Sequence, residues 1–372
     1  MQKSERQGAI LFLLNKLDVG GSQRKTVNLA NDLARRGRTV LIAYLNSPAT
    51  LEPLVAPGVP VFNLQRTSKF SPSVVFRIVR LVRAHNVRNL IAISLYPALY
   101  ASVSRLFLVD RTVRFLASVN TTEFGTRKGH RQMAILRHAL NRMDIVIFGA
   151  ESQRAAWRQR YGVGRAGKLT AVLYNGVDPE LFRRDAVTPA HVEGWSTSKV
   201  VVGTVGRLAA EKAQGHILSL VAELRRRGHD VGALIVGSGP EEPRLASLGS
   251  ELGIANHVHL VQEVEDVRPY LAAMSIFVLS SVAVETFSNA ALEAMAMSLP
   301  VVSSDIGGMK EMLQHGGGVL YPPGDLGALR EQVERLIIDD DHRCDVGNAA
   351  REAVVAHFGT KRMVDSLLEQ LQ

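Results

Sequence analysis

The chain of 372 residues is longer than one hydrophobic core usually fills, and its 46% apolar and 21% charged residues exclude a disordered protein. The net charge of +9 is uneven, because residues 1–185 hold 29 Lys and Arg against 11 Asp and Glu (+18), and the remainder holds 15 against 24 (−9). This asymmetry indicates that only the first half meets a polyanion or an anionic surface. The alternative is that the charge serves solubility and has no partner.

The first half alternates apolar strands with helices. Strands are predicted at residues 9–14, 39–45, 89–95, 113–119 and 144–150, and helices at residues 22–37, just after Gly20 and Gly21, and 72–86. Because the strands are continuous apolar runs separated by helices, they favour a parallel sheet that is covered on both faces.

The same alternation restarts in the second half, with strands predicted at residues 200–206, 231–239, 258–262, 275–281 and 300–305. A boundary is expected within residues 175–199, which contain Pro179, Pro189 and Gly194. We therefore predict an α/β protein with two doubly wound parallel-sheet domains, residues 1–184 and 185–357, that face each other across a central cleft. A C-terminal helix at residues 358–372 is expected to pack back toward the first domain. In such sheets ligands bind beyond the carboxyl ends of the strands.

Two glycine-bearing loops follow strands of the second domain. Gly206 ends one strand, with Arg207 beside it and Lys212 five residues further on. Arg grips phosphate oxygens with a planar fork and Lys supplies a point charge, so this loop suits a diphosphate, although such residues are more often solvated. The second loop, residues 237–240 (GSGP), begins with Gly237 and indicates either a tight turn or a close approach of backbone to a neighbour.

Glu285 and Glu293 flank an otherwise apolar helix. Glutamate is seldom buried without a partner, so both carboxylates need one. Ser288 is placed to cap the helix, which would turn the amides of Phe287, Ser288 and Asn289 into an anion site. The two glutamates are spaced to accept hydrogen bonds from the two sugars of a nucleotide-sugar. The alternative is a capping acid together with a buried salt bridge.

With these motifs in place, the chain resembles a retaining glycosyltransferase of family 4 with the GT-B fold, which has two Rossmann-like domains. The resemblance is carried, in chain order, by Gly20-Gly21, NGVD at residues 175–178, GRLAAEK at 206–212, GSGP at 237–240, the Glu285 and Glu293 pair, and SDIGGMKE at 304–311. It is dense in the second half of the chain and sparse in the first.

The resemblance implies a role for each matching position. Arg207 and Lys212, after Gly206, would bind the donor diphosphate, and the backbone around Val264 would meet the base. The remaining donor residues would be Gly20, Gly21, Gly237, Glu285, Phe287, Ser288, Asn289 and Glu293, with Glu293 on the ribose. Glu285, Arg207 and Lys212 would be the catalytic residues, because cations and amides stabilise the charge that grows on the departing diphosphate. No metal or cofactor is expected, and the acidic run at residues 339–341 is interpreted as a solvated turn.

One acceptor-side position departs from the family. Many members carry a histidine after the strand that here ends in SVN, where this chain has Asn120. Asparagine can hydrogen-bond a sugar hydroxyl but does not take a proton at neutral pH. Retaining transfer can still proceed, because the leaving phosphate can serve as the base.

Basic residues of the first half suit an anionic membrane surface or a lipid-linked acceptor. Arg77, Arg80 and Arg83 fall near one flank of a helix whose other side is apolar. Further cations are Arg88, Arg111, Arg114, Arg127, Lys128 and Arg131. Interleaved stacking aromatics are few, so nucleic acid is not expected. The alternative is a plain exposed helix face.

We expect a cytoplasmic enzyme with peripheral contact at the inner face of the membrane, because the single Cys344 forms no internal disulfide and no apolar run reaches the length of a signal peptide core or a membrane span. The predicted reaction moves a sugar from a nucleotide-diphosphate donor to a hydroxyl of a cell-surface glycan or glycolipid precursor. Two alternatives stay open. An epimerase or hydrolase of the same fold would turn over the donor without an acceptor, and a catalytically silent scaffold would bind the donor without transfer.

Overall fold

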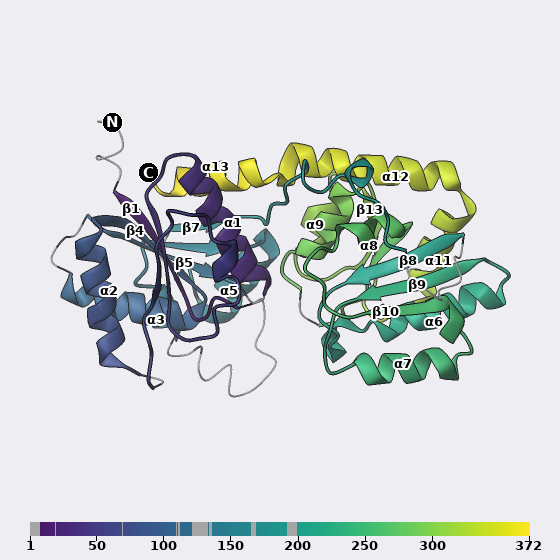
Figure 1. Ribbon diagram of the computed structural model, residues 1–372, viewed down its shortest axis with the longest axis horizontal. Helices are drawn as coiled ribbons and strands as arrows, with labels where there is room; N and C mark the ends of the chain where they lie inside the picture. The colour runs from purple at the N-terminus through teal and green to yellow at the C-terminus, as the bar shows by residue number, and fades with distance from the viewer. Residues whose placement is uncertain are drawn as a thin grey trace. The chain divides into compact units, whose positions relative to one another are not determined.

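The computed structural model describes residues 8–18, 20–68, 70–108, 110, 112–120, 133, 136–164, 169–191, 199–283 and 285–372. The chain divides into two compact units, which are Met1–Tyr174 together with Met363–Gln372, and Asn175–Arg362 (Figure 1). Each unit contains one parallel sheet with helices around it. The predicted class of two doubly wound, Rossmann-like α/β domains is therefore confirmed, and the cleft between them stays a prediction.

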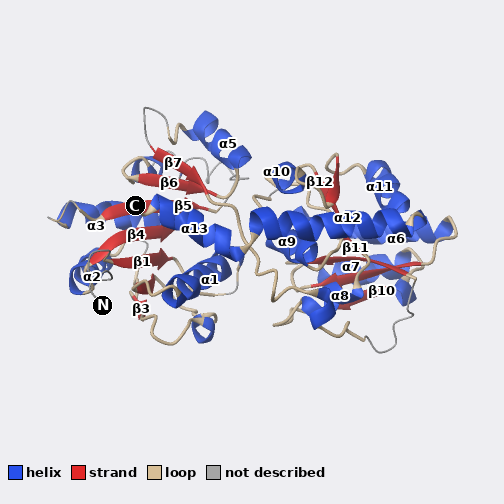
Figure 2. Cartoon of the chain, turned by 90° about the horizontal axis from the view of Figure 1, so that it is seen from above, coloured by secondary structure: helices blue, strands red, loops and turns tan. Residues whose placement is uncertain are grey.

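The sheet of the first unit has seven strands in the order β3-β2-β1-β4-β5-β6-β7, which Figure 2 lets the reader follow from β1 to β7. The strands are β1 (Ala9–Leu14), β2 (Val40–Tyr44), β3 (Val61–Asn63), β4 (Val87–Ile93), β5 (Arg114–Val119), β6 (Ile145–Phe148) and β7 (Leu169–Val172). Every residue of β1 and β2 is buried, as expected for central parallel strands that are covered on both faces.

Helices cover both faces of this sheet. The described helices are α1 (Gly21–Arg35), α2 (Pro72–Ala84), α3 (Leu95–Ser104), α5 (Glu151–Tyr161) and α13 (Thr360–Gln370). Apolar side chains of α2, α3 and α5 share one core cluster, and those of α1 and α13 share another on the opposite face. Figure 1 shows α1 in purple and α13 in yellow on the same side of the sheet.

The sheet of the second unit has six strands in the order β10-β9-β8-β11-β12-β13. The strands are β8 (Val200–Val205), β9 (Val231–Val236), β10 (Val258–Val261), β11 (Ile276–Leu279), β12 (Val301–Ser304) and β13 (Gly318–Tyr321). The helices are α6 (Gly215–Arg226), α7 (Glu242–Glu251), α8 (Arg268–Ala273), α9 (Asn289–Ala296), α10 (Met309–Leu313), α11 (Leu326–Ile338) and α12 (Asp340–Ala353). Side chains of α6, α7 and α11 form one core cluster with the sheet, and α9 contacts β11, β12 and α12.

The division between the units falls at Tyr174, whereas the sequence pattern placed it after residue 184. The segment after Tyr174 joins the second unit because Val177 pairs with Gly359 in a parallel bridge and Asn175 hydrogen-bonds the backbone before α9. Likewise the C-terminal helix begins at Thr360, later than the predicted residue 358, and its buried side chains lie in the core of the first unit.

Candidate functional site

Most of the predicted donor residues lie at one edge of the second unit's sheet. Gly237 follows β9, Gly206 follows β8, Glu285 lies in the segment after β11, and Gly307 follows β12. These four strands are consecutive neighbours and run parallel. Because the carboxyl ends of parallel strands meet at the same edge of a sheet, the structure brings these four loops together.

Lys212 and Glu285 form an ion pair at this edge. Lys212 Nζ lies 2.5 Å from Glu285 Oε2, and their side chains are 25% and 11% exposed. The backbone of Lys212 is fixed from the sheet side, because the hydroxyl of the buried Ser280 donates to its carbonyl at 2.9 Å. The sequence predicted both residues as site residues but not as partners. The pair also matches the alternative interpretation of Glu285 as a salt-bridge carboxylate, so a role in donor binding stays a proposal.

Arg207 occupies a different place from Lys212. Its side chain is 65% exposed, and its guanidinium is paired with the carboxylate of Glu211, a partner that the sequence analysis missed. The amide of the buried Gln214 donates to the carbonyl of Arg207 at 2.9 Å, which fixes the backbone below the exposed guanidinium. The two predicted diphosphate cations therefore differ in exposure, and each is paired with its own carboxylate.

The start of α9 is built as the sequence predicts. Ser288 is the N-cap, and its hydroxyl accepts a hydrogen bond from the Ala291 amide at 3.2 Å. The side chain of Phe287 is buried and packs edge-on against Phe358, so this residue offers only backbone to a ligand. The amide of Asn175 donates to the Phe287 carbonyl at 2.7 Å, which gives the NGVD motif its structural role.

Asn289 and Glu293 are the more exposed positions on a helix whose other residues are mostly buried. They lie four residues apart on α9, so they share one side of it, and both are partly exposed. The intervening positions Ala291 and Leu292 are buried in the core. A polar stripe that begins beside the helix cap is therefore accessible to a ligand.

Gly307 lies directly against the backbone of Glu285. Its φ of 57° lies in the left-handed region, and a Cβ atom added to it would stand 1.8 Å from the Glu285 carbonyl oxygen. The neighbouring Gly308 amide donates to the Thr286 carbonyl at 2.8 Å. The glycine pair of the SDIGGMKE motif thus lets the segment after β12 lie directly against the segment that carries Glu285.

The glycines of the GSGP loop approach another loop of the protein. A Cβ atom on Gly237 would lie 2.0 Å from the Gly206 carbonyl oxygen, and one on Gly239 would lie 2.1 Å from that of Leu208. Of the two interpretations left open, the close approach of backbone is therefore present, and the neighbour is the loop that bears Arg207. Val264 is partly exposed in the segment after β10, which is held to the GSGP loop by a hydrogen bond from the Glu263 amide to the Ser238 hydroxyl at 2.9 Å.

The acidic run at residues 339–341 begins a helix instead of forming a solvated turn. Asp339 caps α12, since its carboxylate accepts from the His342 amide at 2.8 Å, and Asp340 pairs with Arg343 at 2.8 Å. Across the described ranges, no three or more His, Cys, Asp or Glu side chains are grouped so that they could hold a metal ion. A metal-free reaction stays a prediction.

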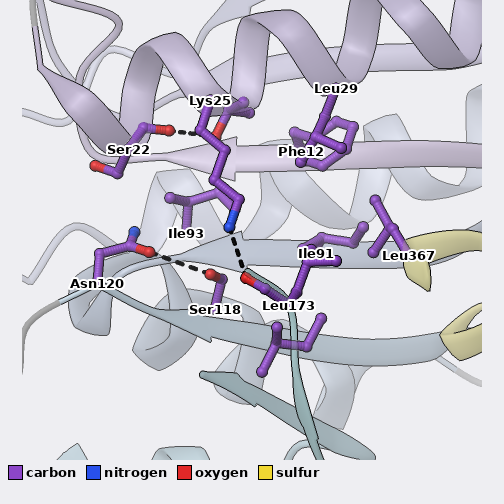
Figure 3. A pocket seen from close by; sticks show the side chains of 12 residues that line it. Phe12, Ser22, Lys25, Leu29, Ile91, Ile93, Ser118, Asn120, Leu173 and Leu367 are labelled. Carbon is purple, nitrogen blue, oxygen red and sulfur yellow. Dashed lines mark hydrogen bonds between the residues drawn. The ribbon is translucent and has the colours of Figure 1, made fainter. Parts of the chain in front are cut away.

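Gly20, Gly21 and Asn120 belong to the first unit and are described within it. The Gly20 carbonyl accepts from the Arg24 amide at 2.9 Å and so begins α1, whose first residue is Gly21. Asn120 directly follows β5, and its Oδ1 accepts a hydrogen bond from the Ser118 hydroxyl at 3.2 Å (Figure 3).

The basic flank of α2 lies beside an apolar patch that the sequence analysis missed. Arg77 and Arg83 donate to backbone carbonyls of Leu64 and Phe107, respectively, while Arg80 is exposed. The apolar patch consists of Phe76 and Phe107, whose ring centroids lie 5.5 Å apart, and the adjacent Leu106, and these side chains are 59%, 47% and 76% exposed. Four of the predicted cations, Arg111, Arg127, Lys128 and Arg131, lie outside the described residues. In the part of the chain that the structure describes, no helix is long and apolar enough to span a bilayer.

Two sequence families match this chain in succession. Residues 19–181 match the family described as Glycosyltransferase Family 4, and residues 199–339 match the family described as Glycosyl transferases group 1.

Similar proteins extend over most of the chain. The GDP-mannose-dependent alpha-(1-6)-phosphatidylinositol monomannoside mannosyltransferase of Mycobacterium tuberculosis is 26% identical over 81% of this chain and 80% of its own length. The lipopolysaccharide core biosynthesis glycosyltransferase LpsE of Rhizobium meliloti is 29% identical over 46% of this chain and 49% of its own. Among solved structures, Anabaena Alr3699/HepE in complex with UDP shares the fold, with a TM-score of 0.82 at 22% identity over 98% of this chain and 99% of that one.

Proposed function

Since this chain belongs to the group 1 glycosyltransferases of family 4, we propose that it transfers a sugar from a nucleotide-diphosphate donor to a hydroxyl group with retention of the anomeric configuration. In this reaction the bond between the anomeric carbon and the phosphate oxygen breaks, and its electron pair leaves with the diphosphate. The acceptor oxygen bonds to the anomeric carbon on the same face. The hydroxyl proton passes to the departing phosphate oxygen, so no protein base is needed.

The observation that carries the proposal is the placement of the Lys212–Glu285 pair beside the capped start of α9. A helix start attracts anions, and an ammonium group beside it adds positive charge where the leaving diphosphate gains negative charge. Glu285 provides a carboxylate at the same place, which suits the hydroxyls of the transferred sugar. The more exposed Arg207 would contact the diphosphate from the solvent side, and its ion pair with Glu211 would then break.

The proposed acceptor is a cell-surface glycan or glycolipid precursor. The names of two relatives support this choice, because one acts on a phosphatidylinositol monomannoside and another belongs to lipopolysaccharide core biosynthesis. Exposed Phe76, Leu106 and Phe107 beside the arginines of α2 also fit peripheral contact with an anionic membrane, where such an acceptor would be found.

A thermal-shift screen tests donor binding. UDP-, GDP- and ADP-sugars are added to the protein and to Lys212→Ala and Glu293→Ala, because a ligand that binds the native state raises the melting temperature. We expect one donor class to stabilise the parent chain and both variants to lose most of that shift. If both variants respond like the parent, the assignment of the donor site is wrong. Transfer to membrane extracts with the stabilising donor then separates an active transferase from a silent scaffold, and donor turnover without acceptor would favour an epimerase or hydrolase.

A further inference from the structure

Arg66 lies at the carboxyl edge of the first unit's sheet, where residues that follow three of its strands meet. Asn46 follows β2, Arg66 follows β3, and Tyr96 follows β4 in the first turn of α3. The Cζ atom of Arg66 lies 5.5 Å from the centroid of the Tyr96 ring, so these two side chains together bridge the ends of β2 and β1, the strands between β3 and β4. All three residues are partly exposed. In parallel α/β sheets this edge is where ligands bind.

The guanidinium of Arg66 is held by neutral groups. Nδ2 of Asn46 donates to the carbonyls of Leu45 and Arg66 at 3.2 Å each, which turns Oδ1 of Asn46 toward the guanidinium. This oxygen accepts from Arg66 Nη2 at 2.6 Å and from Nε at 3.2 Å, and the Tyr96 ring lies against the same group. Among the described residues no carboxylate pairs with Arg66. Other arginines of the first unit do have such partners, namely Arg36, Arg88 and Arg105, which pair with Asp365, Asp110 and Asp144.

One nitrogen of this guanidinium has no hydrogen-bond partner. Nη1 of Arg66 is shielded from solvent and makes no hydrogen bond within the described part of the chain. Because Asn46 uses protons of Nε and Nη2, the protons of Nη1 and the second proton of Nη2 point away from it. Two such parallel N–H groups match two oxygens of a phosphate or a carboxylate. A shielded charged donor without a partner carries a desolvation cost that an oxyanion would remove.

Lys25 shows how another cation of the first unit avoids this cost. Lys25 lines the small pocket of Figure 3, and its Nζ donates to the Leu173 carbonyl at 2.9 Å. Burial lowers the pKa of Lys25 to about 7, because the ammonium form loses hydration that no anion replaces. The amine can therefore become neutral, whereas a guanidinium stays charged in proteins. Arg66 needs an anion where Lys25 does not.

We propose that Arg66 binds an oxyanion of the acceptor, so that the acceptor substrate carries a phosphate or a carboxylate group. Arg66 is then a specificity-determining residue, which favours an anionic acceptor over a neutral one. The inference rests on the proposed function, because that function requires an acceptor and assigns the diphosphate of the donor to Lys212 in the other unit.

Side-chain ¹⁵N NMR of the arginines tests whether Arg66 binds an oxyanion. The Nε signal of Arg66 is assigned by its absence in Arg66→Lys, and the donor site is first saturated with the nucleoside diphosphate that stabilises the protein. Inorganic phosphate, glucose 6-phosphate and glucuronate are then compared with methyl glucoside at equal ionic strength. We expect the Arg66 signal to shift saturably with at least one anion and to stay in place with the neutral glycoside and with sodium chloride. No saturable shift with any anion overturns the proposal.

The same titration identifies the oxyanion and its source. A shift with glucose 6-phosphate and not with glucuronate assigns a phosphate, and the reverse result assigns a carboxylate. Dihexanoyl phosphatidylglycerol, compared with glucose 6-phosphate, separates a lipid head group from a sugar phosphate. A shift with inorganic phosphate, combined with unchanged transfer by Arg66→Met, would mean an adventitious ion only and would overturn the role in acceptor recognition.

Transfer assays separate acceptor recognition from a purely structural role. Arg66→Met should lower transfer to an acceptor extract about 10- to 100-fold, as for the loss of a charged hydrogen bond, while stabilisation by the donor is unchanged. Arg66→Lys should keep part of the activity because it keeps the charge. Arg35→Met is the control, since it removes an exposed arginine that pairs with Asp32 in the last turn of α1, and it should change neither readout.

Inhibition by added inorganic phosphate gives a readout that a structural role would not change. Phosphate should inhibit transfer by the parent protein more strongly than transfer by Arg66→Met, because only the parent has the guanidinium for which phosphate and acceptor compete. A structural role alone would lower the melting temperature of Arg66→Met and leave the inhibition equal in both proteins.

The two proposals fail in different measurements. An Arg66 signal that no anion moves, although a sugar nucleotide stabilises the protein, overturns the role of Arg66 and leaves the proposed function in place. Absence of stabilisation by any sugar nucleotide overturns the proposed function, and this result is read from melting temperatures.

Discussion

Lys212 and Glu285 stand 73 positions apart in the chain, and their side chains meet at 2.5 Å beside the first turn of α9. Neither side chain is fully solvated at this place. A donor that binds here exchanges one partner for another, because its diphosphate would attract the ammonium and its sugar hydroxyls would donate to the carboxylate. Donor binding and the ion pair are therefore coupled in our account.

The two members of the pair should differ in what they bind. Lys212→Met is expected to weaken a bare nucleoside diphosphate by about 10- to 100-fold, as for the loss of a charged hydrogen bond. Glu285→Gln should leave the bare nucleotide bound as well or better, since Lys212 loses its competitor, but should weaken the complete sugar nucleotide. Isothermal titration with both ligands measures the two effects. Equal losses for both ligands in both variants would contradict this division of labour.

The contribution of Ser288 to the stability of α9 can be measured separately from its effect on donor affinity. Ser288→Ala should cost about 1 kcal/mol of unfolding free energy, because the Ala291 amide loses its acceptor. Ser288→Asp should keep the cap yet lower donor affinity, since its charge repels the diphosphate. Asp325→Ala is the control, because it removes the cap of α11 and should cost a similar free energy while donor affinity is unchanged. Urea denaturation and donor titration provide the two readouts.

Gly307 offers a test of how tightly Glu285 is positioned. Gly307→Ala brings a Cβ atom into the Glu285 carbonyl, and displacement of a site residue by about 1 Å commonly costs about 100-fold in rate. Gly324→Ala is matched in backbone conformation, with a φ of 80°, but its Cβ meets open space. Both variants should lose about 1 kcal/mol of stability from the left-handed conformation, and only Gly307→Ala should lose transfer activity. Retained activity in Gly307→Ala would show that this contact does not position Glu285.

Lys25 should leave a signature in the pH dependence of stability. Its pKa is lowered from 10.5 to about 7 in the folded chain, so between these values the unfolded chain binds more protons. The free energy of unfolding therefore rises with pH in this window by up to about 1.4 kcal/mol per pH unit. Relative to Lys25→Met, the parent protein should gain stability from pH 7 to 10 and show no change in the difference below pH 6. A difference that is flat throughout would mean that Lys25 keeps its ordinary pKa.

The apolar patch of the first unit should mediate vesicle binding. Replacing Leu106 and Phe107 with Ser is expected to reduce sedimentation with phosphatidylglycerol-containing vesicles about tenfold, and added salt should reduce it further because the arginines of α2 contribute. Leu169→Ser removes an equally exposed apolar side chain from β7 and serves as the control. Loss of binding in both variants alike would point to nonspecific adsorption.

The central strands were predictable from sequence, whereas of the four edge strands only β10 was predicted. The missed strands, β3, β7 and β13, each lie at an edge of its sheet. They are short and only partly buried, so they lack the continuous apolar run that marks β1 or β9. A strand is recognised in the sequence by its run of buried apolar residues, so a strand that is only partly buried is missed.

Some features of the site follow from neighbouring residues in the chain, and others depend on contacts between segments far apart in it. Ser288 as a cap follows from its position before an apolar run, and its role is confirmed by the hydrogen bond to Ala291. To predict the Glu285–Lys212 and Arg207–Glu211 pairs, one must know which loops share a sheet edge and which side chains turn outward. The pocket at Lys25 combines α1, four strands and the C-terminal helix, which no local pattern connects.

A crystal structure of the protein with its stabilising sugar nucleotide would show directly where the donor binds. Our account predicts the diphosphate within hydrogen-bond distance of Lys212 and the amides at the start of α9, with Glu285 on the sugar hydroxyls. Density for the donor at another place, with the Lys212–Glu285 pair intact and nothing bound beside it, would contradict the account.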